Sequence, residues 1–409
     1  MAGFNLIILG RIWVISGTVL SSEATRPFTL HRLATLMEAA RGDPREAGGV
    51  LNPAAARGPD GQLYLFPRLV AEGNYSRIGI ARVEFDHAGN PTSVERLGIA
   101  LEPSEPYEKN DITGGGCEDP RISYMACLQR YVMTYTALSP AGPRIAVAVS
   151  HDLLTWERLG LVGFAAEEGL RLENAVDNKD AVLFPSLITD PQTGKRAMVL
   201  VHRPTVAGSR SVFQDPWWGH RTSTTDARLA PRINHPSIWI SYSRGVTQLA
   251  DLCSFRSHHR LLSPRESWER AKVGAGAPPA LTPHGWLLVY HGVAHRAGHF
   301  RYSAGAVLLD RDDPRRVLYR TKGPILTPGA DDQLGVVPDV VFPTAIDQRT
   351  DLGMPDRVDV YYGMADSRIG VATLTLPHLL EVSPPGKARS SRSPSRPTTA
   401  APPKSLRPG

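Results

Sequence analysis

The sequence lacks most of the signatures that identify common enzyme classes and metal sites. No Walker A loop, Rossmann glycine fingerprint, HExxH zinc motif or GxSxG nucleophile elbow occurs in its 409 residues. Cysteine is scarce: Cys117, Cys127 and Cys253 have no metal-ligand spacing and are too few for a disulfide framework. Such sparse thiols are typical of a reducing compartment. We therefore expect no metal site and no bound cofactor.

A strongly basic folded surface is also missing, although the formal net charge is +6. Residues 385–409 contain Lys and Arg but no acid, and their six positive charges equal the whole excess. The remainder of the chain is formally neutral, so nucleic acid is not expected as a partner. The tail is rich in Pro, Ser and Arg and nearly free of large apolar side chains, which is typical of disorder.

Long apolar runs are absent as well. Residues 1–24 resemble a weak signal sequence, but Arg11 interrupts the run, which is too short to span a bilayer securely. We expect a cytoplasmic protein with no membrane partner. Residues 30–41 have apolar side chains at helical spacing, which predicts one amphipathic helix in an N-terminal extension at 1–45.

What the sequence does contain is an internal repeat with a period of about 65 residues. An alternating apolar segment recurs five times, each time preceded by a second strand-like segment and by a short segment that contains proline. Such units bury their faces by radial packing, which predicts an all-β, five-bladed β-propeller at residues 46–380. An insertion is expected at 205–236 and a disordered basic tail at 381–409. A pair of β-sandwiches or an irregular all-β fold is the alternative. The proline-bearing segments are 51–55, 118–122, 183–188, 277–282 and 341–346.

In a propeller the innermost strands meet at the central axis, where we expect the proline-bearing segments to converge. The sharpest candidate is the run Glu118-Asp119-Pro120-Arg121, with two carboxylates and a guanidinium after three glycines. Buried charges must be paired or functional, and pairing of Arg121 with Glu118 or with a neighbouring blade is the structural alternative. Several cations near the axis indicate an anionic substrate such as phosphate. The other candidates are Asn52, Arg68, Lys179, Asp180, His202, Arg203, Lys272, His291, Tyr361, Tyr362 and Asp366, of which His202 and His291 are equally typical of buried core histidines.

Five motifs resemble those of glycoside hydrolase family 130. They are GGGCEDPRI, DNKDAVLFPSLI followed by VLVHRP, KVGAGAPPALTPHGWLLVYHGV, YSAGAVLLDRDDP followed by PIL, and GVVPDVVFPT with YYGMAD, in that order over residues 50–377. The resemblance implies a five-bladed propeller and an inverting β-mannoside phosphorylase. Such an enzyme cleaves a β-mannoside with inorganic phosphate and releases α-mannose 1-phosphate.

The resemblance also assigns roles to residues. It makes Asp119 the general acid, which protonates the glycosidic oxygen through the 3-hydroxyl of the sugar. An inverting displacement by phosphate needs no second carboxylate as base, but it needs cations that hold the anion. The expected partners are thus an oligosaccharide and phosphate as co-substrate. The resemblance matches Asn52, Arg68 and Asp366 to the groups that bind the mannosyl residue, and Arg203, Lys272, Lys179 and His291 to those that bind phosphate.

Two alternatives remain open from the sequence. Some members of the family are hydrolases that lose phosphate-binding groups and present glutamates in the pocket. Glu167, Glu168 and Glu173 are the candidates for such a role here. A β-mannosidase of this kind would turn over without phosphate, whereas a non-catalytic carbohydrate-binding propeller would bind sugar and form no product.

Overall fold

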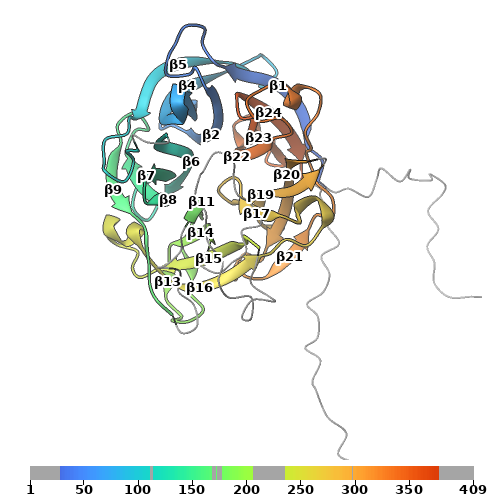
Figure 1. Cartoon of the computed structure of the whole chain (residues 1–409). Helices are drawn as coiled ribbons and strands as arrows, with labels where there is room; N and C mark the ends of the chain where they lie inside the picture. Colours follow the sequence, from blue (N-terminus) through green and yellow to red (C-terminus); the bar gives the residue numbers. More distant parts are fainter. Residues whose placement is uncertain are drawn as a thin grey trace, which may run out of the picture.

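The chain forms β-sheets that stand around a central axis like the blades of a propeller (Figure 1). The predicted five-bladed all-β architecture is confirmed. Blades one and two are joined into one eight-stranded sheet, because β4 and β6 make a short parallel contact at residues 75–76 and 115–116. The computed structural model describes residues 28–110, 114–167, 172, 177–205, 235–296 and 298–376.

Each blade is an antiparallel meander that begins at the axis. Blade one consists of β2 (Gly49–Arg57), β3 (Leu63–Ala71), β4 (Tyr75–Phe85) and β5 (Pro91–Leu101), and blade two of β6 (Gly115–Met125), β7 (Arg130–Ser139), β8 (Gly142–Ser150) and β9 (Glu157–Leu161). Blade three consists of β11 (Asp177–Leu183), β14 (Val199–Thr205), β15 (Ile238–Ser243) and β16 (Ser254–Leu262), with β10 (Gly163–Phe164) at its edge and β12 (Ile188–Thr189) and β13 (Arg196–Ala197) as a separate pair. Blade four consists of β17 (Lys272–Ala275), β18 (Ala280–Thr282), β19 (Gly285–Arg296), β20 (His299–Leu309) and β21 (Val317–Arg320), and blade five of β22 (Val341–Gln348), β23 (Arg357–Met364), β24 (Arg368–Thr375) and β1 (His31–Glu38). Short 3-10 turns occur at η2 (Glu72–Asn74), η4 (Leu249–Cys253), η5 (Ser267–Glu269), η6 (Asp331–Gln333) and η7 (Thr350–Leu352).

The N-terminal strand closes the ring. β1 pairs antiparallel with β24, so the first strand of the chain is the outermost strand of the last blade. The helix predicted over residues 30–41 is therefore wrong. The apolar spacing fits a helix, but the edge of β24 offers backbone partners, and Leu36 and Met37 are buried against neighbouring strands. Tertiary pairing overrides the local periodicity here.

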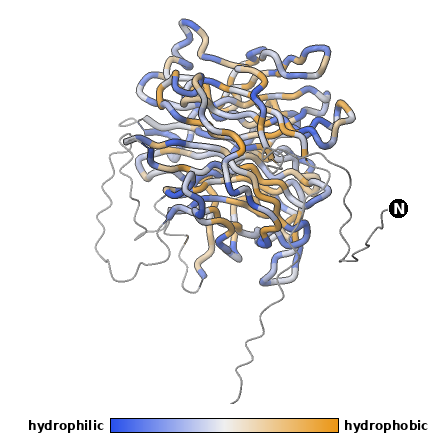
Figure 2. Tube along the Cα trace, turned by 90° about the vertical axis from the view of Figure 1, so that its right-hand side faces the viewer, coloured by the Kyte–Doolittle hydropathy of each residue, from blue (hydrophilic) through white to orange (hydrophobic). Residues whose placement is uncertain are grey.

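The hydrophobic core lies between neighbouring blades. Each of the five larger clusters of buried side chains draws residues from two adjacent blades. Between blades four and five, for example, Leu287 and Leu308 pack with Val360. Figure 2 shows hydrophobic residues along the strands and hydrophilic residues in many of the peripheral loops. Because both faces of a blade are covered, polar side chains inside the ring need a specific reason to be there.

That reason is a repeated interruption of the innermost strands. In blades one, two and three, two residues of the inner strand fall out of the pairing ladder. The first residue of each pair has a positive φ, of 45°, 47° and 55° in chain order. Such a bulge bends the strand and re-aims a side chain, and Asn and Asp tolerate the left-handed conformation better than most residues. The unpaired residues are Asn52-Pro53, Asp119-Pro120 and Asp180-Ala181.

A glycine brings the second bulge close to blade one. Gly116 has a φ of 122°, and a Cβ at this position would lie 1.9 Å from the carbonyl oxygen of Ser76. No other residue type fits such an approach, so Gly116 allows the parallel contact between β6 and β4. The contact places the start of β6 beside the strands that carry the first bulge.

The proline-bearing segments mark the inner strands less evenly than predicted. Segments 51–55 and 341–346 lie within β2 and β22, and 118–122 lies within β6. In blade three the inner strand is β11, so segment 183–188 begins only at its last residue. In blade four segment 277–282 begins after β17 has ended. Most of the insertion at 205–236 and all of the tail at 381–409 lie outside the described residues.

Candidate functional site

The carboxyl group of Asp119 lies among donors from blade one. The Nδ2 of Asn52 donates a hydrogen bond to Asp119 Oδ1 at 2.9 Å, and the Nη1 of Arg68 donates to the same oxygen at 3.3 Å. The Asp119 side chain is 13% exposed, whereas Asn52 is buried. Two donors on one oxygen fix the direction in which the carboxyl group points.

Arg68 connects Asp119 with further carboxylates. Its Nη2 donates to Glu118 Oε1 at 2.7 Å, and its Nε donates to Ser76 Oγ at 2.9 Å. Burial opposes the charged guanidinium, but three nearby carboxylates, among them that of Asp366, outweigh it and raise the pKa of Arg68. Asp366 follows β23 and has a positive φ of 48°. Blades five, one and two thus contribute to one cluster of charged and polar side chains, which we call the acid half. It consists of Asn52, Arg68, Glu118, Asp119 and Asp366.

Glu118 is the acid half's most deeply buried carboxylate. Burial raises the pKa of Glu118, and the positive charges of Arg68 and Lys179 do not cancel this effect. Its ion pair is with Arg68. The pairing of Glu118 with Arg121 that the sequence left open is therefore not the arrangement, because Arg121 donates to backbone carbonyls.

Arg121 braces the acid-bearing bulge against the other side of the axis. Its Nε donates to the carbonyl oxygen of Gly276 in blade four at 2.5 Å, and its Nη1 donates to the carbonyl oxygen of Asp119 at 2.6 Å. Its guanidinium also lies 5.7 Å from the ring centre of Phe342 in blade five. Arg121 is 1% exposed, and burial lowers its pKa. One side chain therefore ties three blades together at the bulge that carries Asp119.

Blades three and four bring a second cluster of charged and polar side chains to the axis, which we call the cation half. It consists of Lys179, Asp180, Arg203, Lys272 and His291. Arg203 Nε donates to Asp180 Oδ2 at 2.6 Å, and His291 Nε2 lies 3.5 Å from the same oxygen. Burial opposes ionisation of Asp180, but Arg203 and His291 hold its pKa well below the usual range. Burial lowers the pKa of His291 to about 3, so its imidazole is neutral at pH 7.

Two lysines complete the cation half. Lys179 is the register partner of Arg203 across β11 and β14. Burial opposes its charge, but Asp177 and other carboxylates outweigh burial and raise the pKa of Lys179. The Nζ of Lys272 lies 5.1 Å from the ring centre of Tyr302. Arg203 and Lys179 therefore interact with the buried carboxylate of Asp180, and Lys272 of the next blade interacts with His291 beside it.

The structure brings the eight predicted site residues into these two adjoining halves. Arg121 links them, since its charge is affected by Asp119 on one side and by Asp180 on the other. Asp180 has no predicted role, although the sequence placed it among the candidates beside Lys179. The acid half contains Asn52, Arg68, Asp119 and Asp366, and the cation half contains Lys179, Arg203, Lys272 and His291.

His202 lies apart from both halves in the core of blade three. Its Nδ1 lies 3.0 Å from Asn178 Oδ1, and its Nε2 lies 2.8 Å from Ser241 Oγ. Its ring stacks on Phe164 with centroids 4.5 Å apart, and burial lowers its pKa well below the usual value. Of the two readings that the sequence left open for His202, the satisfied core histidine is the one that fits.

Glu167 is engaged at the periphery of blade three. Its Oε1 accepts a hydrogen bond from the backbone N–H of Ser257, and its Oε2 accepts one from the N–H of His258 at 3.2 Å. A carboxylate held by two backbone donors is a structural anchor for the strand β16. Glu168 and Glu173, the other two glutamates considered, lie outside the described residues.

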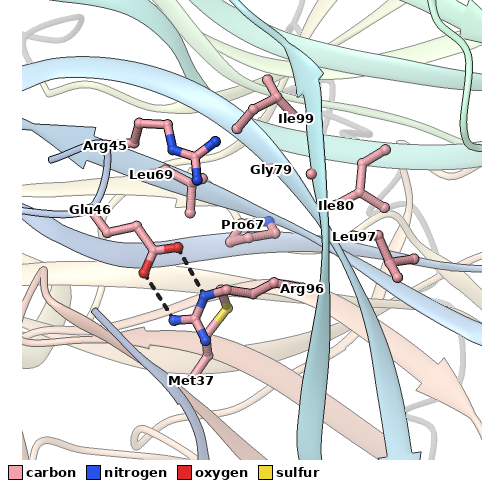
Figure 3. A pocket seen from close by; sticks show the side chains of 11 residues that line it. Met37, Arg45, Glu46, Pro67, Leu69, Gly79, Ile80, Arg96, Leu97 and Ile99 are labelled. Atoms are coloured by element: carbon pink, nitrogen blue, oxygen red, sulfur yellow. Dashed lines mark hydrogen bonds and ion pairs between the residues drawn. The ribbon is translucent and has the colours of Figure 1, made fainter. Parts of the chain in front are cut away.

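A separate pocket of about 270 Å³ lies on the flank of blade one, next to β1 (Figure 3). Apolar side chains such as Leu69 and Ile80 line it, together with the ion pair between Arg96 and Glu46 at 2.9 Å. None of the eight predicted site residues contributes to its lining. Across the described parts of the chain, no group of three or more His, Cys, Asp or Glu side chains is arranged to hold a metal ion.

Comparisons with known proteins agree with the motifs and the fold. The family model of glycoside hydrolase family 130, described as β-1,4-mannooligosaccharide phosphorylase, matches residues 26–211 and 231–383. A 1,2-β-oligomannan phosphorylase of Thermoanaerobacter sp. (strain X514) is 31% identical over 338 residues, which are 81% of this chain and 91% of that protein. The chain belongs to glycoside hydrolase family 130.

Relatives within family 130 differ in the linkage that their names give. A β-1,4-mannooligosaccharide phosphorylase of Ruminococcus albus is 29% identical over 69% of this chain and 70% of its own length. The solved structure of a β-1,2-mannobiose phosphorylase from Listeria innocua, in complex with β-1,2-mannobiose, has a TM-score of 0.61 at 25% identity, covering 85% of this chain and 97% of that one. The chain therefore resembles family members named for both 1,2- and 1,4-linked substrates.

Proposed function

We propose that this protein is an inverting β-mannoside phosphorylase, which cleaves a β-mannoside with inorganic phosphate and releases α-mannose 1-phosphate. The observation that carries the proposal is the pairing of one hydrogen-bonded carboxyl group, Asp119, with a separate group of cations across the axis. Membership of family 130 supports it, since curated relatives are named as phosphorylases of β-mannosides.

In this reaction Asp119 is the general acid. It donates its proton toward the glycosidic oxygen as the bond to the anomeric carbon breaks, so that the departing sugar leaves as a neutral alcohol. Arg68 and Asn52 hold the carboxyl group in place before the transfer and stabilise the carboxylate afterwards. Asn52, Arg68 and Asp366 also bind the mannosyl residue.

The cation half binds phosphate on the opposite face of the sugar. Arg203 and Lys272 hold the anion, with contributions from Lys179 and His291. Phosphate attacks the anomeric carbon from that face, which inverts its configuration and gives the α-anomer from a β-linked substrate. The cations offset repulsion between the anion and the carboxylates of the acid half, and they align the attacking oxygen.

The chemistry of the second carboxylate favours phosphorolysis over hydrolysis. An inverting hydrolase needs a carboxylate that activates water as a general base. Among the described residues, the carboxylate that Arg203 and His291 contact in the cation half is that of Asp180, but Arg203 donates to it at 2.6 Å and its pKa is held well below the usual range. A carboxylate of such low basicity is a poor base, whereas its cationic neighbours suit a dianion.

The test is incubation with β-1,2-mannobiose, β-1,4-mannobiose, mannosyl-β-1,4-glucose and mannosyl-β-1,4-N-acetylglucosamine, each with and without phosphate. We expect mannose 1-phosphate only when phosphate is present, and the best substrate names the linkage and the acceptor. Free mannose formed at the same rate without phosphate would reassign the protein as a β-mannosidase, the second candidate that the sequence left open.

We further propose that phosphate is the only co-substrate, that no cofactor takes part, and that the enzyme acts in the cytoplasm without nucleic acid or membrane. Cys117, Cys127 and Cys253 are free thiols, which supports a reducing compartment. In the described part of the chain, no helix is long and apolar enough to cross a membrane. Treatment with a chelator should leave turnover unchanged, and cell fractionation should recover the protein with cytoplasmic markers.

A further inference from the structure

Three successive blades carry the same local structure at the axis. Asn52, Asp119 and Asp180 each follow the last paired residue before the bulge of an inner strand, and each has a positive φ. The resemblance to family 130 gives roles to the first two and none to the third. Asp180 is therefore the unassigned member of a set whose other members lie at the reaction centre.

The arginines of blades one and three are also equivalent. Arg68 is paired in register with Leu51, the residue before the first bulge, and Arg203 is paired with Lys179, the residue before the third. Arg68 contacts the carboxyl group of Asp119, and Arg203 contacts that of Asp180. Arginines at equivalent positions thus contact a bulge carboxylate on both sides of the axis, Arg68 that of the next blade and Arg203 that of its own blade.

The surroundings of Asp180 are built for a carboxylate at considerable cost. A left-handed conformation strains a non-glycine residue, and a buried carboxylate loses its hydration. Gly274, on the facing strand β17, adds a third requirement, because a Cβ there would lie 2.2 Å from Asp180 Oδ2. A well-packed apolar residue would avoid the loss of hydration of the buried carboxylate, so stability alone does not explain Asp180.

The group around Asp180 also contains buried polar atoms that lack a hydrogen-bond partner among the described residues. They are Nη2 of Arg121 and both ring nitrogens of His291, of which Nε2 has only the 3.5 Å contact with Asp180. Arg121 is 1% exposed and His291 is fully buried. Native structures rarely leave such groups unsatisfied, so the cation half is complete only when a further polar group occupies it.

Resting on the proposed function, we propose that Asp180 is a positioning residue of the phosphate site. It holds the Nε edge of Arg203 and thereby sets the direction in which the guanidinium meets the anion. Asp180 acts on phosphate through Arg203 and makes no contact with the sugar. It orients a functional side chain in the cation half, as Arg68 orients Asp119 in the acid half. Removal of the Asp180 carboxylate therefore weakens the binding of phosphate and leaves the binding of the sugar unchanged.

Two substitutions separate the positioning of Arg203 from a change of charge. Asp180→Ala removes both the charge and the acceptor, whereas Asp180→Asn removes the charge but keeps an oxygen that accepts from Arg203. We expect Asp180→Ala to raise KM for phosphate at least tenfold and KM for the mannoside less than twofold. In Asp180→Asn, KM for phosphate should stay within about threefold of the wild-type value, because a neutral acceptor still orients Arg203. Tighter or unchanged phosphate binding in Asp180→Ala would overturn the proposal, and so would equal effects on both substrates.

Gly274→Ala tests the same point with every charge intact. Its added methyl group would lie 2.2 Å from Asp180 Oδ2 and 2.4 Å from His291 Cε1, so it displaces both side chains, and KM for phosphate should rise while KM for the mannoside stays near the wild-type value. If Asp180→Ala does not fold, comparison with His291→Gln decides the matter, because only Gly274→Ala also displaces Asp180, and a rise in KM for phosphate no larger than that in His291→Gln would overturn the proposal. Asp359→Asn is the matched control, because Asp359 is also a buried carboxylate in contact with arginine, but it lies at the end of β23 opposite to Asp366. The control should lower the melting temperature and leave both KM values unchanged.

A binding measurement keeps this inference separate from the assignment of function. Inorganic phosphate should raise the melting temperature of the wild type and of Asp359→Asn, and it should do so much less for Asp180→Ala. If the wild type releases no mannose 1-phosphate but phosphate still stabilises it in an Asp180-dependent way, the proposed function fails and the role of Asp180 stands. Phosphate that stabilises the wild type and Asp180→Ala equally would overturn the role of Asp180 whatever the turnover.

Discussion

The two halves of the central axis use one backbone device for different chemistry. In the acid half, a left-handed residue on a bulge presents the carboxyl group of Asp119 to Asn52 and Arg68. In the cation half, the equivalent residue Asp180 is engaged by Arg203 at 2.6 Å and lies beside His291. The Asp119 side chain is 13% exposed and that of Asp180 is 2% exposed.

The comparison shows that the neighbours of a carboxylate decide its use. Asp119 keeps some access to solvent, and its hydrogen bonds come from groups that also suit a sugar. Asp180 is surrounded by cations that hold its pKa low, so it serves as an anchor for them. The bulge is the same in both halves, and the side chains on adjacent strands make one half acidic and the other cationic. Each prediction below removes one element from one half.

The largest expected effect is the loss of the general acid. Asp119→Asn should reduce kcat by about 10³-fold, because general acid catalysis contributes about 10²- to 10⁴-fold. The amide retains the shape of the side chain, so the melting temperature should change little. Steady-state rates and thermal unfolding of the same preparation measure both. Turnover close to that of the wild type would remove Asp119 from the role of acid.

Loss of a cation should come next. Lys272→Ala should raise KM for phosphate by about 10- to 100-fold, since a hydrogen bond to a charged group contributes about 1.5–3 kcal/mol. KM for the mannoside should stay nearly constant, because the sugar is bound by the acid half. Initial rates over a grid of both substrates give the two constants. An equal rise in both would place Lys272 outside the phosphate site.

The neutral histidine should give a pH-dependent effect on stability. Burial lowers the pKa of His291 to about 3, below the value near 6.5 of an exposed histidine. Between these values the unfolded chain binds a proton that the folded protein does not, so stability falls as the pH decreases. The slope is about 1.4 kcal/mol per pH unit below about pH 6.5.

Between pH 7 and pH 5, the free energy of unfolding of His291→Gln should therefore fall by about 2 kcal/mol less than that of the wild type. Urea unfolding at the two pH values measures the difference. His202 is also buried with a lowered pKa and remains in both proteins, so it does not affect the comparison. Parallel losses in the variant and the wild type would show that His291 is not held neutral in the folded state.

The smallest expected effect is in the acid half. Asn52→Ala removes one of the two donors to Asp119 Oδ1 and should lower kcat/KM for the mannoside by about tenfold. KM for phosphate should be unchanged, whereas Lys272→Ala should change KM for phosphate and leave KM for the mannoside nearly constant. A double variant that combines both should show the product of the two effects if the halves act independently. A rise in KM for phosphate in Asn52→Ala would contradict the division into two halves.

The repeat and the motifs predicted most of the fold and of the site. The recurrence of apolar strand-like segments about every 65 residues indicated the blades, because each blade repeats the same unit of strands. The strand β1 was predicted as a helix, because Leu36 and Met37 fit helical spacing and its partner β24 lies more than 300 residues away in the chain. Pairing between strands so far apart in the chain produces no pattern in the local sequence.

Asp180 was a sequence candidate without an assigned role, for a related reason. The sequence placed proline at the same position in each inner strand, which holds for Pro53 and Pro120, directly after the bulge residues. In blade three Ala181 follows the bulge residue, and Pro185 comes only after β11 has ended. Alignment on proline therefore shifted blade three and hid the equivalence of Asp180 with Asp119. Backbone φ revealed it, and no residue type encodes φ uniquely.

The most direct test of the account is a time course with β-1,2- and β-1,4-linked mannosides and phosphate, followed by proton and phosphorus NMR. Inverting phosphorolysis predicts α-mannose 1-phosphate as the first product, in an amount equal to the shortened sugar, which is mannose itself when the substrate is a mannobiose. Free mannose that accumulates at the same rate whether or not phosphate is present would contradict the assignment of the cation half to phosphate.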